Sequence, residues 1–362
     1  MGSKVHENLY DNLDKLSVRQ KIYYPLRKHA IEKVGKLKGD VNDFVTISKL
    51  LKNSHRVFFK KKINFLYRDL KSKIDLNECD IVHATTLFSD GAIALRIWRE
   101  YKIPYIVAVR GTDNFFLNYR YDLRSLGKEI ISNAKYLIFI SNSLEQNFNQ
   151  NSFIKGLDNL VVPNNKIIYN GLDPFWVQNT IGKRDEVNPM NFLYIGKFNS
   201  NKNVVRLIKA FLKVTNKYEN LQLNLVGSGG NQEKEVKKLS EKHKAKINFH
   251  GPIYDQKELQ KMYQANDIFA MTSISETFGL VYVEALTQGL PILFTENQGI
   301  DGTFKEYVGE SANPKSIDSI AEGLERLINN YSKYELDKID FSIFSWDDIA
   351  KTYLDLYNKI LT

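Results

Sequence analysis

The stretch that most constrains this chain is residues 272–291, where a polar turn leads into an apolar pattern that stops at a glycine and a proline. Thr277 is a usable N-cap, and apolar residues follow it at helical spacing. Short apolar runs at 267–271 and 291–294 flank the stretch, and each is typical of a buried strand. The sequence therefore predicts a strand, a loop, a helix and a second strand, which together form a βαβ unit.

The loop of such a unit is a site for anions. The loop leaves the carboxyl end of a strand, and the exposed N–H groups of the next helix point into the same corner. Glu276 lies in this corner, where its carboxylate is placed to hold hydroxyl groups of a phosphate compound. Glu284 lies about two helical turns further on if the helix begins at Thr277. We expect the two carboxylates to line one elongated polar ligand.

These residues resemble the donor-site signature of the family-four glycosyltransferases, which are retaining enzymes of the GT-B fold. The resemblance rests on Glu276-Thr-Phe-Gly-Leu, on Glu284 and on the Gly-x-Pro that ends at Pro291. A bare pair of glutamates would be a weak signal, and a capped helix with solvated glutamates is the structural alternative. The resemblance implies an α/β protein with two Rossmann-like doubly wound domains that face a cleft. A C-terminal helix would cross back to the first domain.

The length of 362 residues fits two domains of about 170 residues each. We expect residues 1–172 to form an N-terminal acceptor-side domain and residues 173–345 to form the nucleotide-sugar donor domain. Residues 346–362 would be the returning helix. The apolar first strand that is usual in the family is missing from the start of this chain.

In the first half, three apolar runs between residues 79 and 140 alternate with helical patterns, which is typical of a parallel sheet with ligands at its carboxyl edge. His83 ends the first run, and the second delivers Arg110 and Asp113. Relatives often carry a histidine where Arg110 stands; an arginine can bind phosphate but cannot act as a base. Asp113 pairs with Arg110, holds an acceptor hydroxyl or only stabilises a turn. His83 is more often a hydrogen-bonded histidine than a catalytic one.

In the second half, a strand pattern at 191–196 is followed by Lys197 and, five residues later, by Lys202 at the start of a helix pattern. The resemblance assigns both lysines to the donor diphosphate. The alternative is two exposed lysines, but cations near a helix start are disfavoured by the helix dipole, and a bound anion would remove that conflict.

The resemblance thus implies a site in three groups. The catalytic group is Glu276, Lys202, Lys197 and Arg110. The donor-binding group is Ile253, Thr277, Phe278, Gly279, Leu280 and Glu284, and the acceptor side is Asp113 and His83. The chain has no Asp-x-Asp pattern and no zinc-ligand spacing, so we expect neither a metal nor another cofactor.

The net charge of +9 is carried by the first half. Residues 1–172 hold 28 Lys+Arg and 17 Asp+Glu, whereas residues 173–362 hold 23 and 25. Residues 49–74 alternate cations with aromatic groups, so they either lie on an anionic membrane surface or form a solvated helix that packs Phe58 and Phe65 inward. We expect no nucleic-acid partner, since no RNA-binding signature accompanies the charge.

A single cysteine and no apolar run of about 20 residues favour a cytoplasmic protein that is at most peripheral on the inner face of the membrane. We expect a metal-independent hexosyltransferase that moves a sugar from a nucleotide-sugar, most simply a UDP-sugar, to a glycan or lipid-linked acceptor in bacterial surface polysaccharide synthesis. The alternatives are a sugar-nucleotide epimerase or a phosphorylase on the same fold, and a non-catalytic GT-B partner subunit.

Overall fold

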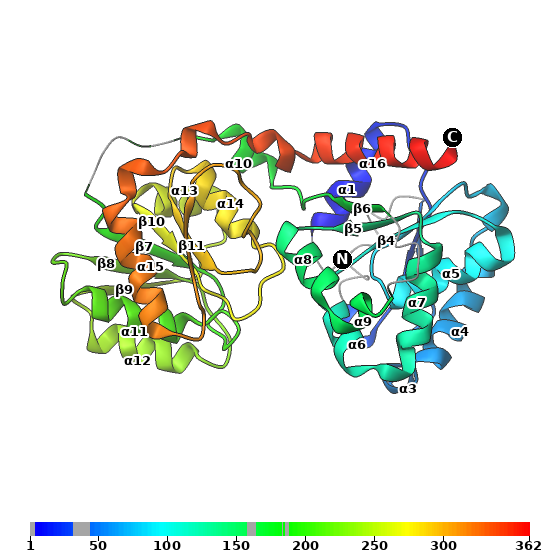
Figure 1. Ribbon diagram of the computed structural model, residues 1–362, viewed down its shortest axis with the longest axis horizontal. Helices are drawn as coiled ribbons and strands as arrows, with labels where there is room; N and C mark the ends of the chain where they lie inside the picture. Colours follow the sequence, from blue (N-terminus) through cyan, green and yellow to red (C-terminus); the bar gives the residue numbers. More distant parts are fainter. Residues whose placement is uncertain (1–3, 32–43, 158–163, 183, 185–187) are drawn as a thin grey trace. The chain divides into compact units, whose positions relative to one another are not determined.

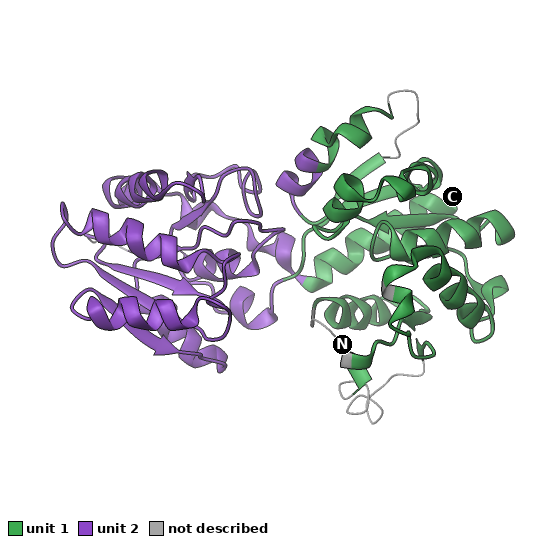
Figure 2. Cartoon of the chain, turned by 90° about the horizontal axis from the view of Figure 1, so that it is seen from below, with its two compact units in different colours: residues 1–140, 148–171, 346–362 green, residues 141–147, 172–345 purple. Residues whose placement is uncertain are grey.

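The computed structural model describes residues 4–31, 44–157, 164–182, 184 and 188–362 (Figure 1). The chain divides into two units, which Figure 2 shows in different colours. Unit 1 comprises residues 1–140, 148–171 and 346–362, and unit 2 comprises residues 141–147 and 172–345. The C-terminal helix α16 (Trp346–Leu361) therefore belongs to unit 1.

Unit 1 is built on a parallel four-stranded sheet with the order β3-β4-β5-β6. Its strands are β3 (Val82–Ala84), β4 (Tyr105–Ala108), β5 (Tyr136–Phe139) and β6 (Asn164–Ile167). Most connections between its strands are helical: α5 (Ser89–Tyr101), α6 (Asp113–Tyr119), α7 (Arg124–Asn133), α8 (Asn142–Gln150) and α9 (Ser152–Lys155). The part of α8 up to residue 147 is counted with unit 2. The four residues of β4 are fully buried, as the apolar pattern of this run predicts for a central strand.

The first element that the structure describes in unit 1 is a helix rather than a central strand. Helix α1 (Lys4–Lys15) packs with α16 on the sheet, where Leu9 and Leu13 share a core with Ile106 and Ile138 (Figure 1). The next strand, β1 (Ile22–Tyr24), pairs with β2 (Val45–Ile47) in a separate two-stranded sheet. In the described part of the chain, the four-stranded sheet receives no strand from before residue 82.

The basic-aromatic stretch 49–74 forms α3 (Ser54–Val57) and α4 (Phe59–Lys71). Helix α4 buries Phe59, Ile63 and Leu66, so it is packed against unit 1 along one face. The solvated-helix interpretation placed Phe58 inward; this is wrong, because Phe58 caps the start of α4 and is 59% exposed. None of the helices that the structure describes combines the length and apolar character needed to span a bilayer.

Unit 2 is a six-stranded parallel sheet with the order β12-β11-β10-β7-β8-β9. Its strands are β7 (Asn191–Ile195), β8 (Gln222–Val226), β9 (Ile247–Gly251), β10 (Ile268–Ala270), β11 (Ile292–Thr295) and β12 (Gly309–Ala312). Its helices are α10 (Pro174–Gln178), α11 (Val204–Val214), α12 (Glu233–Lys242), α13 (Gln256–Gln264), α14 (Leu280–Thr287) and α15 (Ile317–Asn329). The sequence order reverses between β7 and β10, which are neighbours in space. Ligands of doubly wound sheets bind at such a switch point.

Candidate functional site

The loops that follow β7 and β10 are joined by two asparagines. Asn203, the residue before α11, has a left-handed backbone with φ of 60°. Its buried side chain donates from Nδ2 to the carbonyl oxygens of Thr272 at 2.9 Å and Pro314 at 2.7 Å. Asn201 forms hydrogen bonds through its side chain with both the carbonyl and the N–H of Ser275, at 2.9 and 3.1 Å. These hydrogen bonds therefore hold the loop after β7 against the loop after β10, at the switch point of the sheet.

This arrangement brings Lys202 and Glu276 into contact. Lys202 Nζ lies 2.7 Å from Glu276 Oε2, and the two side chains are 26% and 13% exposed. Glu276 Oε1 accepts a hydrogen bond from the N–H of Thr277 at 3.2 Å, and Ser273 Oγ lies 3.4 Å from Oε2. A cation and a carboxylate that are 74 residues apart in sequence thus share one half-buried position at the carboxyl edge of the sheet.

The backbone of Glu276 is fixed by the loop after β11. Its N–H donates to Gln298 Oε1 at 2.9 Å, and its carbonyl accepts from the N–H of Gly299 at 3.1 Å. Gly299 has φ of +57°, and a Cβ placed on it would lie 2.9 Å from both Glu276 Cγ and the carbonyl oxygen of Phe278. Only a glycine fits this conformation and this close approach without displacing the carboxylate.

Helix α14 begins later than Thr277. Its N-cap is Gly279, with φ of +84°, and Leu280 is its first residue. The interpretation of Thr277 as the N-cap is therefore wrong, and Glu276 lies in the preceding loop rather than on the helix. The reason is tertiary: the side chains of Asn201 and Gln298 hold Ser275 and Glu276 in the loop through hydrogen bonds to their backbone. The N–H groups near Phe278 to Leu280 still lie at the helix start, as predicted.

Glu284 lies on α14 and is not in contact with Glu276. The hydroxyl of Tyr263 donates to Glu284 Oε2 at 3.0 Å. Burial raises the pKa of Glu284 to about 7, and the nearby carboxylate of Asp173 acts in the same direction. A carboxyl group poised near neutral pH is a candidate for binding hydroxyl groups, since their donation would favour its ionised form.

The remaining predicted donor contacts lie on separate loops of unit 2. Lys197 is exposed directly after β7, and among the hydrogen bonds and ion pairs described for the chain its side chain takes part in none. Ile253 is half-buried and follows β9. Phe278 is buried, and its ring packs 5.8 Å from that of Phe344. Of the predicted lysines, the structure therefore brings only Lys202 into contact with a predicted glutamate.

Three predicted residues belong to unit 1. Arg110 donates from Nε to the carbonyl of Thr85 at 3.2 Å. Asp113 accepts from the backbone N–H groups of Arg110, Leu87 and Phe88, and burial raises its pKa to about 6. Its carboxylate thus braces the turn after β4 through the backbone of Arg110 instead of pairing with the guanidinium.

His83, the middle residue of β3, is held by a partner on the C-terminal helix. Its Nδ1 lies 2.9 Å from the hydroxyl of Tyr357, and its ring lies 5.1 Å from that of Tyr353. Burial and the charge of Arg110 lower its pKa to about 3, so the imidazole is neutral at physiological pH. This is the environment of a hydrogen-bonded structural histidine.

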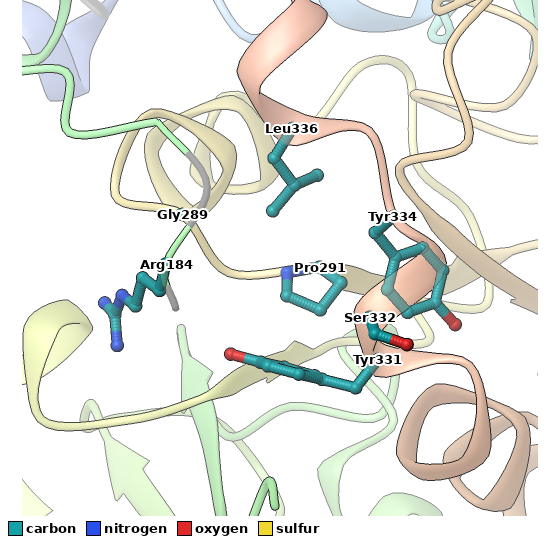
Figure 3. Close-up of a pocket in the computed structure, with 7 residues that line it drawn as sticks. All are labelled: Arg184, Gly289, Pro291, Tyr331, Ser332, Tyr334 and Leu336. Atoms are coloured by element: carbon teal, nitrogen blue, oxygen red, sulfur yellow. The ribbon is translucent and has the colours of Figure 1, made fainter. Parts of the chain in front are cut away.

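A small enclosed pocket of unit 2 does not include the predicted site residues (Figure 3). Its volume of about 10 Å³ has room for no more than a water molecule. Arg184, at its edge, donates to the carbonyl oxygens of Tyr263, Gln264, Asn266 and Gln288. The guanidinium joins the segments before β10 and β11, so its role is structural.

Sequence reasoning missed the residues that position Glu276. Asn201, Asn203, Gln298 and Gly299 hold the two loops through their backbone and side-chain bonds. An asparagine directly before an apolar helix pattern indicates an ordinary N-cap, although Asn also tolerates the left-handed conformation that Asn203 adopts. The partners of Asn201 and Gln298 lie far away in sequence, and no local pattern identifies them.

Two family models match this chain. The model described as Glycosyltransferase Family 4 matches residues 7–174, and the model described as Glycosyl transferases group 1 matches residues 180–338. The matched regions follow one another and together include Arg110, Lys202, Glu276 and Glu284.

Characterised and uncharacterised relatives match between about half and nearly all of this chain. An uncharacterized glycosyltransferase of Methanocaldococcus jannaschii is 29% identical over 53% of this chain, and the match spans 53%, or about half, of that relative. A second uncharacterized glycosyltransferase of the same organism is 26% identical over 94% of this chain and 97% of its own length. Alpha-monoglucosyldiacylglycerol synthase of Acholeplasma laidlawii is 25% identical over 86% of this chain and 82% of its own.

Solved structures share the fold. HepE of Anabaena, crystallised with UDP, superposes with a TM-score of 0.65 at 16% identity, covering 94% of this chain and all of that one. Sucrose-phosphate synthase of Thermosynechococcus elongatus superposes with a TM-score of 0.64 at 17% identity, covering 94% and 99%. The predicted α/β fold with parallel sheets in two domains is thus confirmed. The chain belongs to the family-four, group 1 type of GT-B glycosyltransferases.

Proposed function

We propose that this protein is a retaining hexosyltransferase that uses a nucleotide-sugar, preferably a UDP-sugar, and transfers the sugar to a glycan or lipid-linked acceptor. The observation that carries the proposal is the contact of 2.7 Å between Lys202 and Glu276 at the switch point of unit 2. This pair lies beside the start of α14, where exposed N–H groups favour a negative ligand.

The transfer reaction leaves negative charge on the departing diphosphate, and the site must stabilise this charge. The bond between the anomeric carbon and the diphosphate oxygen breaks, and its electron pair stays on the departing diphosphate. A bond forms from the acceptor oxygen to the same carbon, and the acceptor proton leaves with the diphosphate. Fixed positive groups stabilise the developing charge without reorganisation. Lys202 and the N–H groups at the start of α14 supply them in unit 2, with Lys197 as a further cation.

Glu276 and Glu284 would hold the two ends of the donor. Glu276 is held at both its N–H and its carbonyl, so its carboxylate is positioned to accept hydrogen bonds from sugar hydroxyls. Glu284, on α14, would accept from the ribose hydroxyls. Thr277, Gly279, Leu280 and Ile253 complete the donor contacts through their backbone. The charges on the diphosphate are met by protein cations, so we propose that no metal ion is required.

The names of relatives support the choice of substrates. Structural neighbours were solved with UDP, and with UDP-glucose. One sequence relative is an alpha-monoglucosyldiacylglycerol synthase, and another is a putative teichuronic acid biosynthesis glycosyltransferase of Bacillus subtilis. These names favour a donor with UDP and an acceptor that is a lipid or a surface polysaccharide, which would place the protein at the inner face of the membrane.

A panel of nucleotide-sugars tests the proposal. We expect one donor to raise the melting temperature and to be hydrolysed slowly without acceptor, releasing the nucleoside diphosphate and a sugar with the donor's anomeric configuration. A phosphorylase would need phosphate or a glycan, and an epimerase would return an isomeric nucleotide-sugar. A silent partner subunit would release nothing. Release of an inverted sugar would contradict the retaining mechanism.

A further inference from the structure

One end of unit 1 exposes an unusual group of large apolar side chains. Val57, Phe58, Phe115, Tyr119 and Tyr121 are each between 56% and 69% exposed, and they come from two short segments of the chain. Exposed apolar residues scattered singly need no explanation, but a cluster of aromatic residues marks a contact surface. We refer to these five residues, together with the neighbouring Lys60 and Lys61, as the aromatic-basic patch.

Direct contacts join the two segments. The rings of Phe59 and Phe116 lie 5.9 Å apart, Phe115 packs against Phe116 at 5.8 Å, and Phe115 lies 5.6 Å from Tyr119. An open cavity of about 500 Å³ lies between the segments, lined on one side by residues 57–61 and on the other by Arg120, Asp122 and Leu123. Figure 1 shows α3 and α6 at the same end of unit 1.

The cations of the patch are in excess. Lys60 and Lys61 line the cavity and are exposed, and Arg120 lines its opposite wall. Of the cations that line this cavity, Arg120 is paired with Asp122 at 2.6 Å, which leaves the charge of the two lysines. Residues 51–62 contain five lysines and arginines and no acidic residue. The cation-rich face continues along α4, because Lys61 also lines a second cavity with Lys49 and Arg68.

The start of α4 is attached to helix α5 of unit 1. Lys62 is 9% exposed, and its Nζ lies 2.7 Å from Ser89 Oγ at the start of α5 and 4.9 Å from the ring of Phe59. Phe59 itself is buried. The exposed positions of Phe58, Lys60 and Lys61 are therefore fixed by packing on both sides, which is what a docking surface requires.

We propose that the aromatic-basic patch docks unit 1 on the surface of a bilayer that contains anionic phospholipids. Aromatic side chains such as Phe58 and Tyr121 enter the interface between headgroups and acyl chains, where amphipathic rings are favoured. Lys60 and Lys61 face the phosphate groups, and each cation near such a surface strengthens binding about fivefold. The pairing of Arg120 with Asp122 leaves the excess charge on the lysines, so the proposal predicts which substitutions matter.

Vesicle sedimentation with the full chain tests this proposal without any donor or acceptor. We expect the wild-type protein to sediment with vesicles of 70% phosphatidylcholine and 30% phosphatidylglycerol, and to bind pure phosphatidylcholine far more weakly. The K60Q/K61Q variant is expected to lose about 25-fold in partitioning, and Phe58→Ser about tenfold. A thermal melt shows that each variant folds, which is expected because all three side chains are exposed.

The matched control is K234Q/K238Q, which removes the same charge from exposed lysines of α12 in unit 2. We expect this variant to bind vesicles like the wild type. Equal losses in the two double variants would show attraction by net charge alone and would overturn the proposal. Equal binding to both vesicle types would also overturn it. So would binding of a short RNA that depends on Lys60 and Lys61, together with no binding to vesicles. The slow hydrolysis of the donor, measured without vesicles, tests the proposed reaction independently of membrane binding.

Discussion

Replacing Lys202 by alanine tests whether its ion pair with Glu276 serves only the fold or also catalysis. Nζ of Lys202 lies 2.7 Å from Glu276, and the partners are 26% and 13% exposed. A half-exposed pair of this kind contributes on the order of 1 kcal/mol to folding, equivalent to a shift of a few degrees in Tm. By contrast, loss of one fixed group that stabilises a developing anion lowers kcat by about 10²–10³-fold, or about 3–4 kcal/mol.

Both quantities are measured on the same variants. We expect Lys202→Ala to lower kcat at saturating donor by at least 100-fold while Tm changes by a few degrees, and Glu276→Ala to abolish measurable transfer. The matched control is Lys217→Ala, which breaks an ion pair with Glu325 of the same 2.7 Å length on the surface of the same unit. It should leave kcat unchanged. A kcat for Lys202→Ala within tenfold of the wild type would refute the reasoning, because the pair would then serve the fold alone.

Three further predictions follow from the same contacts. Glu284→Ala should chiefly raise the donor KM. The folded pKa of Glu284, about 7, lies above the usual value of 4.5, so the wild type should lose up to about 3 kcal/mol of stability relative to Glu284→Gln as the pH rises from 4.5 to 7. Parallel pH profiles of unfolding for the two proteins would contradict this. Gly299→Ala should lose activity and about 1–2 kcal/mol of stability, because the added Cβ meets Glu276 Cγ at 2.9 Å in a left-handed conformation; unchanged kinetics would show that the carboxylate does not need this support. Arg184→Gln should lower the free energy of unfolding by about 2–4 kcal/mol in denaturant titrations without changing kcat, since carbonyls of Tyr263, Gln264, Asn266 and Gln288 lose a charged donor; a fall in kcat at constant stability would contradict a structural role.

The sequence was most informative where structure is local. Apolar runs such as 191–196 and 136–140 became β7 and β5 because consecutive buried residues suit a parallel strand covered on both faces. The resemblance assigned both Lys202 and Glu276 to the donor site, but their contact is a finding of the structure: β7 lies beside β10, so the loops that follow the two strands meet.

The remaining features depend on long-range contacts. The start of α14 at Leu280 is determined by Gly279 and by hydrogen bonds from Asn201 and Gln298, which no local propensity encodes. Phe58 is exposed although helical spacing favoured packing it inward, because the chain turns between α3 and α4 at this residue. For Asp113, the turn-stabilising role was one of three that the sequence left open; contacts from Leu87 and Phe88 join the N–H of Arg110 on its carboxylate and decide between them.

The most direct test of the central claim is the affinity of UDP measured by isothermal titration calorimetry for the wild type, Lys202→Ala and the surface control Lys217→Ala. If the Lys202 ammonium and the start of α14 hold the donor diphosphate, UDP binds the wild type and the control equally and binds Lys202→Ala about 10- to 100-fold more weakly, since a charge-assisted hydrogen bond contributes roughly 1.5–3 kcal/mol. Equal UDP affinity for all three proteins would show that the diphosphate binds elsewhere.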